Sequence, residues 1–480
     1  MSKRVILGPF NRIEGDLEVK IEIQDNLITN AWVNTPLFRG FEQILQGKDP
    51  RDSLVYAPRI CGICSVSQSV AASSALRMLN GTKQTKNGEL VTNLLLSIEN
   101  VADHLTHFYL FFMPDFARDA YVHKKWFSNI QPKYKAQVGT AQASFLTARA
   151  NFLNTTAILA GKWPHTLSIQ PGGSTKSISS EEKIQLMNLI ATFRLFLEDQ
   201  LFGCPLEQFN DYRNLDDIEA HRKQFSQSNF TDFLNLAEDL DLEQLGQIPS
   251  NFLSYGAYQT INNSHTFKAG HYKNKFARFN QNVIAEDVSH SWLAQTHEPK
   301  HPSVGSTIPD IGQKGYSWNK APRLAGEVIE VGALSRQVVD QHPLILELNS
   351  HSGSNAKNRV IARLTEVARL IPIMETWCSD IEPADSFCND FELPSSGTGY
   401  GLVEAARGSL GHWISVENKK ILNYQIIAPT TWNFSPRDTS GQPGALEQAL
   451  AGTHLKNGIE DVSIQHIIRS FDPCMVCTVH

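Results

Sequence analysis

Several features that mark special classes of protein are missing from this sequence of 480 residues. Its 43 lysines and arginines are outnumbered by 49 aspartates and glutamates, so it lacks the basic excess typical of nucleic-acid-binding proteins. No apolar run comes near the roughly 20 residues that a membrane-spanning helix needs, and no apolar signal stretch follows the first basic residues. With 41% hydrophobic and 19% charged residues, the chain is not disordered either. We expect a globular protein with a large core, no membrane span and no nucleic-acid partner.

Cysteine is scarce as well. The chain has seven cysteines, an odd number, which are too few for a disulfide framework in a chain of this length. Together with the missing signal stretch, this favours a cytoplasmic location. Four of the cysteines form two Cys-x-x-Cys pairs, Cys61 with Cys64 and Cys474 with Cys477. The other three stand alone and are interpreted as ordinary thiols: Cys204, Cys378 and Cys388.

The hydrophobic pattern predicts an α+β protein with a central bundle of long helices and small sheets at its periphery. Alternating apolar and polar residues predict strands at residues 17–23, 28–33, 401–404, 412–416 and 424–427. Helical periodicity predicts helices at residues 65–79, 89–113, 140–159, 181–201, 355–371 and 444–470. Residues 203–320 are interpreted as short strands and loops. Because the sequence has no internal repeat and no clear linker, we expect residues 1–480 to form one intertwined unit.

The two Cys-x-x-Cys pairs could supply four thiolates to one soft or borderline metal ion. A structural zinc site is the simplest alternative, but its pairs usually lie about 15–20 residues apart, whereas Cys61 and Cys474 are 413 positions apart. A thioredoxin-type redox pair is a further alternative, although no βαβ pattern follows Cys61. Metal analysis would separate these interpretations.

Two segments that contain these cysteines, residues 59–64 and 472–480, resemble the signature motifs of the large subunit of nickel–iron hydrogenases. The resemblance continues along the whole chain, in residues 12–15, 39–42, 103–109, 171–173, 316–323, 407–413 and 429–433. A single Cys-x-x-Cys pair is common, whereas this ordered set of motifs is specific. The resemblance implies the fold of that large subunit and the cleavage of H2.

The resemblance also implies a set of metal ligands. Cys61 and Cys474 would bind nickel terminally, while Cys64 and Cys477 would bridge nickel to an iron ion that carries cyanide and carbon monoxide. In the segment that begins at Pro429, Thr430 would donate a hydrogen bond to a cyanide. A magnesium ion would be held by three further groups: Glu42, the backbone carbonyl of Ile426, and His480.

Four charged residues receive roles in proton handling from the same resemblance. Arg407 would project over the open nickel position, paired with Asp103 and Asp472, and Glu14 would relay a proton from a thiolate such as Cys477 to solvent. Taken alone, each has a more ordinary interpretation. Glu14 would be a helix or turn carboxylate, and Asp472 would be a turn or cap residue. Asp103 would lie on a solvated helix face, and Arg407 would be a surface or salt-bridge arginine.

The sequence departs from the family pattern at three places. Gln68 stands where most members have a histidine, and it can donate a hydrogen bond to a cysteine sulfur but cannot titrate. Ala406 replaces the usual proline before the active-site arginine, which leaves the local backbone less fixed. Asp16 replaces a common histidine. The run at residues 65–69 resembles the cytoplasmic uptake and H2-sensing branch of the family.

The chain lacks a ferredoxin-like cysteine series, so a separate small subunit with iron–sulfur clusters is implied. Most relatives carry a C-terminal extension that is removed after the histidine equivalent to His480, whereas the sensor type is made without one. Because the sequence ends at His480, we expect an H2-sensing hydrogenase of low turnover that controls a histidine kinase. Two alternatives remain, a processed uptake hydrogenase that supplies electrons to respiration and a zinc-binding relative without activity. A reading frame that continues past His480 would contradict the sensor expectation.

Overall fold

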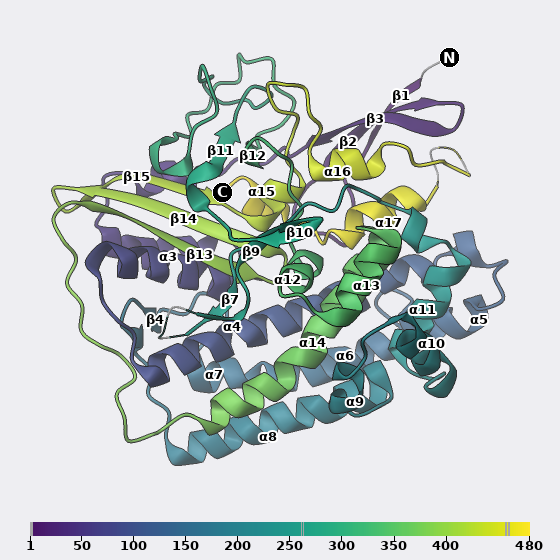
Figure 1. Cartoon of the computed structure of the whole chain (residues 1–480), viewed down its shortest axis with the longest axis horizontal. Coiled ribbons are helices and arrows are strands. Elements are labelled where there is room, and N and C mark those ends of the chain that lie inside the picture. Colours follow the sequence, from purple (N-terminus) through teal and green to yellow (C-terminus); the bar gives the residue numbers. More distant parts are fainter. Residues whose placement is uncertain (1–2, 261, 263, 457, 459–460) are drawn as a thin grey trace.

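The computed structural model describes residues 3–260, 262, 264–456, 458 and 461–480. Long helices lie side by side in one half of the molecule, and α14 (Ala356–Ser379) contacts both α4 (Lys86–Thr106) and α8 (Ser180–Phe196) (Figure 1). In α4, every residue after Lys86 is buried, as expected for a helix at the centre of a core. The Thr85 side chain accepts the Gly88 N–H and fixes the start of this helix.

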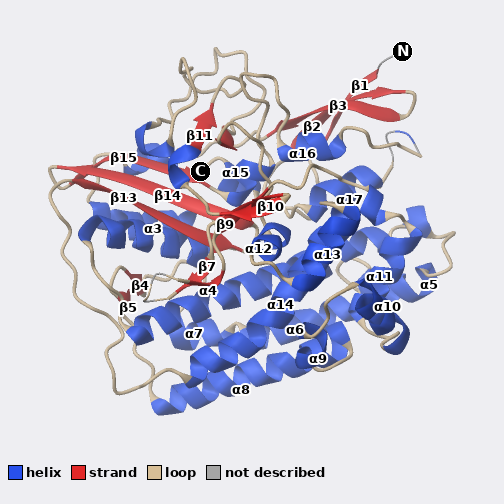
Figure 2. Cartoon of the chain, viewed as in Figure 1, coloured by secondary structure: helices blue, strands red, loops and turns tan. Residues whose placement is uncertain are grey.

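The two larger antiparallel sheets lie in the other half of the molecule (Figure 2). One antiparallel sheet has the order β1 (Lys3–Leu7), β2 (Glu18–Gln24) and β3 (Leu27–Asn34), and in β2 every second side chain is buried. A second antiparallel sheet has the order β13-β14-β15, with the bounds Gly397–Ala405, Gly408–Glu417 and Lys420–Ile427.

The strand β13 lies directly on helix α3 (Ser65–Asn80). This close approach requires glycine, because a Cβ atom at Gly401 would lie 2.0 Å from the Ala71 carbonyl oxygen. A Cβ atom at Gly399 would lie 2.4 Å from the Ala75 carbonyl oxygen. The helix that begins immediately after Cys64 is therefore fixed against the strand that leads to Arg407.

The remaining elements are shorter. The other helices are α1 (Phe41–Leu45), α2 (Ser53–Tyr56), α5 (Phe127–Tyr134), α6 (Thr140–Phe152), α7 (Asn154–Ala160), α9 (Leu206–Asn210), α10 (Leu215–Gln224), α11 (Asn229–Asp239), α12 (Ala333–Val339), α13 (Pro343–Ser352), α15 (Pro429–Asn433), α16 (Ala445–Leu450), α17 (Ser463–Ser470) and α18 (Met475–Thr478). The other strands are β4 (Ile169–Gln170), β5 (Gly173–Ser174), β6 (Phe252–Ser254), β7 (Ala257–Gln259), β8 (His265–Phe267), β9 (Gly270–Lys273), β10 (Lys275–Ala277), β11 (Ile284–Asp287) and β12 (Ala321–Leu324).

The predicted architecture of a helical bundle with small peripheral sheets is confirmed, but several details were wrong. The stretch predicted as helical at residues 140–159 forms two helices, α6 and α7. Residues 203–320 contain the helices α9 to α11, which begin at local caps such as Asn214 and Ser228. The helix predicted to end at Ile371 continues through Pro372 to Ser379. The stretch at residues 444–470 is not helical throughout, because in its described part the helices α16 and α17 lie at the two ends; residues 457 and 459–460 are outside the described part. That residues 1–480 form a single unit stays a prediction.

The two ends of the sequence meet beside the core. Glu14 and Cys474 form a parallel β-bridge, in which the Met475 N–H donates to the Glu14 carbonyl oxygen at 2.7 Å. Side chains of β2 and β3 pack with those of α16 and α17 in one apolar cluster. None of the helices in the described part of the chain has the length and apolar character that crossing a membrane requires.

Candidate metal centre

The four paired cysteines converge at one point in the interior. The sulfur of Cys61 lies 3.6 Å from that of Cys474, and the sulfur of Cys64 lies 3.1 Å from that of Cys477. All four sulfurs lie within 4.8 Å of one another, and all four residues are buried. Four sulfur donors at this spacing suit soft or borderline metal ions.

The protonation of these thiols also favours metal binding. Burial raises the pKa values of Cys474 and Cys477. Hydrogen bonds from the neighbouring cysteines, first of all Cys474, lower the pKa of Cys61. Cys61 therefore loses its proton more readily than Cys474 and Cys477. A metal ion would displace the protons of the remaining thiols and stabilise them as thiolates.

The loop that carries the first cysteine pair is fixed by a residue that the sequence reasoning missed. The buried carboxylate of Glu99 accepts the N–H groups of Val66 and Ser67, each at 2.8 Å, at the first turn of α3. Burial raises the pKa of Glu99 to about 7. Glu99 lies 33 positions from Val66 in the sequence, so no local pattern could have revealed this contact.

A small cavity of about 10 Å³ lies beside the sulfurs, which is room for about one water-sized group. Its lining unites most of the predicted site residues with parts of the β13–β14 turn: Cys64, Gln68, Asp103, Ala405, Ala406, Arg407, Leu410, Pro429, Thr430, Cys474 and Cys477. Within the described residues, Gln68 Nε2 and Asp103 Oδ1 are buried without a hydrogen-bond partner. Buried polar atoms are normally satisfied, so these two fit a site that holds a further polar group.

Thr430 is placed to donate into this cavity. Its hydroxyl oxygen accepts the Cys474 N–H at 3.1 Å, and this bond leaves the hydroxyl proton free to be donated. Pro429 is the first residue of α15, so its missing N–H costs no helical hydrogen bond. The cavity wall therefore combines the apolar ring of Pro429 with the hydroxyl donor of Thr430.

Arg407 occupies the two-residue turn between β13 and β14 and points between two carboxylates. Its Nη1 donates to Asp103 Oδ2 at 2.5 Å, its Nη2 to Asp472 Oδ1 at 3.1 Å, and its Nε to the Asp472 carbonyl oxygen at 2.9 Å. Burial alone would lower the pKa of Arg407, but the two carboxylates raise it well above its usual value. The buried guanidinium is therefore a fixed positive charge.

The two carboxylates beside Arg407 differ from each other. Burial raises the pKa of Asp103 above its usual range, even though Arg407 acts in the opposite direction. Burial also acts on Asp472, but Arg407 and then His107 hold its pKa below the usual value. Asp103 is consequently the carboxyl group that takes up a proton more easily.

Gln68 is held in place from β14. His412 Nε2 donates to Gln68 Oε1 at 2.7 Å, and the Tyr424 hydroxyl donates to His412 Nδ1 at 2.8 Å. Burial lowers the pKa of His412 to about 3, so this ring is neutral. The arrangement fixes the Gln68 carbonyl and leaves its amide NH2 on the cavity side. His412 belongs to the segment 407–413 that the sequence reasoning singled out, but its contact with Gln68 could not be seen there.

Glu14 is half-buried and lies next to the second cysteine pair through its backbone bridge to Cys474. Burial, and then the charge of Cys61, raises the pKa of its carboxyl group, while Arg407 and Arg39 act against this rise. The thiol that affects Glu14 electrostatically is thus Cys61. Proton transfer from Cys477 to Glu14 stays a prediction.

The three residues predicted to hold magnesium also lie together. Glu42 Oε1 lies 3.2 Å from His480 Nε2 and accepts the Ile426 N–H at 2.7 Å. Lys320, which was not predicted, places Nζ 3.6 Å from Glu42 Oε2 and 3.2 Å from Glu286 Oε2. Burial would raise the pKa of Glu42, but Lys320 and His480 lower it to about 2. An anionic oxygen donor in this position suits a hard cation.

Comparison with known proteins gives consistent results over the whole chain. Residues 39–125 and 118–480 match the profile of a family described as nickel-dependent hydrogenase. The large subunit of the periplasmic NiFeSe hydrogenase of Desulfomicrobium baculatum is 28% identical and is aligned over 99% of this chain and 95% of its own length. The uptake hydrogenase large subunit of Bradyrhizobium diazoefficiens is 28% identical over 100% of this chain and 95% of its own length.

A solved structure agrees with these sequence matches. The reduced Ni-Fe-Se hydrogenase of D. vulgaris Hildenborough superposes with a TM-score of 0.86 at 28% identity, and the match covers 100% of both chains. The fold of the chain is thus that of this solved relative over the whole of both chains.

Proposed function

The chain belongs to the nickel-dependent hydrogenase family, and we propose that it is the large subunit of a nickel–iron hydrogenase that cleaves H2 heterolytically at the four-cysteine centre. The observation that carries this proposal is the convergence of two cysteine pairs, 413 positions apart, beside a cavity with unsatisfied polar groups. When bound, the nickel–iron pair supplies the site that accepts the electron pair of H2.

Different residues around the centre would bind the metals and their small ligands. Cys61, Cys64, Cys474 and Cys477 would hold the nickel–iron group through their sulfurs. The Thr430 hydroxyl and the Gln68 amide face the cavity with donors to offer, which suits the cyanide and carbon monoxide ligands of iron. Four sulfurs at these distances and a Gln68 amide nitrogen without a partner support this assignment.

Proton handling falls to the charged residues. Arg407 keeps its proton because its pKa is raised, so its part is electrostatic: it stabilises negative charge that develops in the cavity. Glu14, with a raised pKa and partial exposure, exchanges protons between a thiolate and solvent. Glu42 and His480, with the Ile426 carbonyl, would hold a magnesium ion. The low pKa of Glu42, which Lys320 and His480 cause, keeps this carboxylate anionic and available to such an ion.

For the biological role we infer H2 sensing in the cytoplasm, with an iron–sulfur small subunit and a histidine kinase as partners. This role rests on Gln68 and on the run at residues 65–69. The relatives named above are periplasmic and uptake enzymes, so uptake of H2 for respiration is the second candidate. Slow H2 oxidation and copurification of a kinase would support sensing, whereas rapid turnover without a kinase would support uptake.

One measurement tests the main proposal against a structural zinc site. Protein purified with its small subunit should contain nickel and iron, and its infrared spectrum should show bands of metal-bound cyanide and carbon monoxide, in a region where protein groups do not absorb. Zinc in place of nickel and iron, with no such bands, would refute it.

A further inference from the structure

We propose that Arg336 is the positioning residue that fixes Arg407 at the metal centre, by binding the two backbone carbonyls that precede it. This inference deepens the function proposed above and rests on the role of Arg407 given there. Arg336 lies on α12, does not touch the cavity, and is fully buried.

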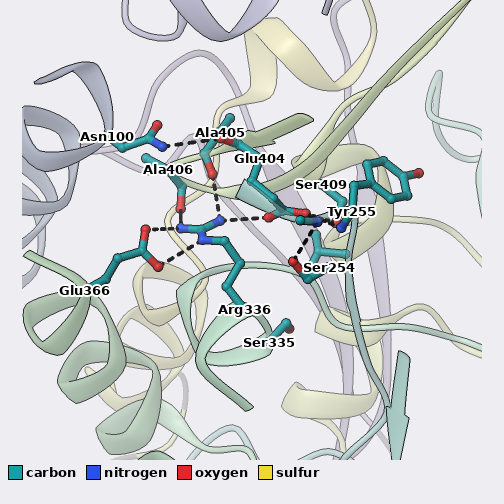
Figure 3. Close-up of polar contacts among 12 residues, drawn as sticks. Asn100, Ser254, Tyr255, Ser335, Arg336, Glu366, Glu404, Ala405, Ala406 and Ser409 are labelled. Carbon is teal, nitrogen blue, oxygen red and sulfur yellow. Dashed lines mark hydrogen bonds and ion pairs between the residues drawn. The ribbon is translucent and has the colours of Figure 1, made fainter. Parts of the chain in front are cut away.

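The contact is made at the turn that carries Arg407. The last pair of the β13–β14 ladder is Ala405 with Gly408, so Ala406 and Arg407 form the two-residue turn between the strands. Arg336 Nη1 donates to the Ala405 carbonyl oxygen at 2.7 Å, and Nη2 donates to the Ala406 carbonyl oxygen at 3.0 Å (Figure 3). Both peptide groups on the N-terminal side of Arg407 are therefore attached to one rigid side chain.

Arg336 is itself immobilised by two buried carboxylates. Its Nε and Nη2 donate to Glu366 at 2.9 and 2.8 Å, and its Nη1 donates to Glu404 at 2.9 Å. Glu404 in turn accepts the Ser409 hydroxyl at 2.6 Å and the Tyr255 N–H at 2.8 Å. With two bonds to the turn and three to carboxylates, all five N–H donors of the guanidinium are used.

The residue type at position 406 explains why the turn needs these contacts with Arg336. Ala406 occupies the first position of the turn, where proline is favoured because its ring presets the backbone. Alanine leaves this peptide freer, so the Arg336 contacts supply the restraint that proline would otherwise give. A shift of about 1 Å in the turn would move the Arg407 guanidinium out of reach of at least one of its carboxylates, and misplacement of this size typically costs about 100-fold in rate.

The test is Arg336→Lys, which keeps the charge but offers three donors in place of a planar fork of five. In its crystal structure we expect the 405–407 turn to move and Arg407 to lose a contact with Asp103 or Asp472. We also expect H2-dependent dye reduction to fall by roughly 10- to 100-fold while nickel and iron contents are unchanged. Adding Ala406→Pro to this variant should restore both the contacts and most of the activity.

The matched control is Arg323→Lys. Arg323 is another buried arginine, which binds Asp438 and the carbonyl oxygens of Pro436 and Gln442, so its replacement removes similar bonds away from the turn. It should lower thermal stability without moving Arg407. If Arg336→Lys does not accumulate as folded protein, Glu366→Gln replaces it as the test variant. This change weakens the pair of hydrogen bonds that orients Arg336, so it should displace the 405–407 turn in the same way.

An undisplaced turn in the folded variant, or a displacement that Ala406→Pro does not reverse, would overturn the role of Arg336. The crystallographic readout is independent of catalysis. If the parent protein shows neither H2 oxidation nor infrared bands of metal-bound diatomic ligands, the proposed function fails, while the position of Arg407 still decides the proposal about Arg336.

Discussion

Replacing Arg407 with lysine should leave a folded, metal-containing protein that has lost most of its H2-oxidising activity. Arg407 bridges Asp103 and Asp472 with separate nitrogens and also binds the Asp472 backbone carbonyl. The lysine ammonium is a single point on a flexible stem and cannot reach both carboxylates in this geometry. The charge remains in the cavity, but its direction and its distance from the sulfurs change.

The size of the effect follows from the bonds that are lost. Asp472 carries the lower pKa and keeps its charge, so it should retain the ammonium, while Asp103, whose pKa burial already raises, takes up a proton. This protonation avoids the large cost of an unpaired buried carboxylate. Removing one preorganised donor from a buried site typically costs about 3–4 kcal/mol of transition-state stabilisation, or roughly 10²–10³-fold in rate.

The assay combines metal analysis, thermal unfolding and H2-dependent dye reduction on the purified heterodimer. Metal contents should equal those of the parent, and the unfolding midpoint should change no more than in the Arg323→Lys control. Turnover near the parental value in a fully metal-loaded Arg407→Lys protein would show that the direction of this charge is irrelevant to the reaction.

Three further outcomes are expected. Cys474→Ser should fail to retain nickel, since it removes one of four converging sulfurs, whereas Cys378→Ser should retain it; full nickel occupancy in Cys474→Ser would exclude Cys474 as a ligand. Glu14→Gln should keep its metals but slow the exchange of H2-derived protons with solvent at least about tenfold, and an unchanged H/D exchange rate would assign the relay to another group. Burial raises the pKa of Glu447 from 4.5 to about 7, so the stability that its protonated form contributes is full below about pH 4.5 and is lost as the pH rises to about 7. As the pH rises between these limits, the free energy of unfolding of the parent should therefore fall by about 3 kcal/mol relative to that of Glu447→Gln. A difference between their denaturant midpoints that does not depend on pH would contradict the raised pKa of Glu447.

The sequence was most informative where residue type alone determines the chemistry. Two cysteine pairs predict a soft-metal site wherever they meet, and the helices and strands around them follow from hydrophobic period. The helices α10 and α11 were missed although Asn214 and Ser228 are good caps, because their polar surroundings outweighed the capping signal. Lys320 and Glu99 were beyond such reasoning, since their partners lie far away in the sequence and no local pattern links them.

The two departures from the family pattern that line the cavity meet on a single hairpin. Gln68 is held by His412 of β14, and Ala406 forms the turn between β13 and β14, which Arg336 holds. At both places a contact between distant residues supplies what the local sequence lacks. His412 orients the Gln68 amide as a donor, and Arg336 fixes the peptide group at Ala406. Because such contacts depend on buried side chains, activity in this chain should respond to changes on α12 and β14 that never touch the metals. The hairpin is thus the element through which the surrounding core sets the position of the charge at the centre.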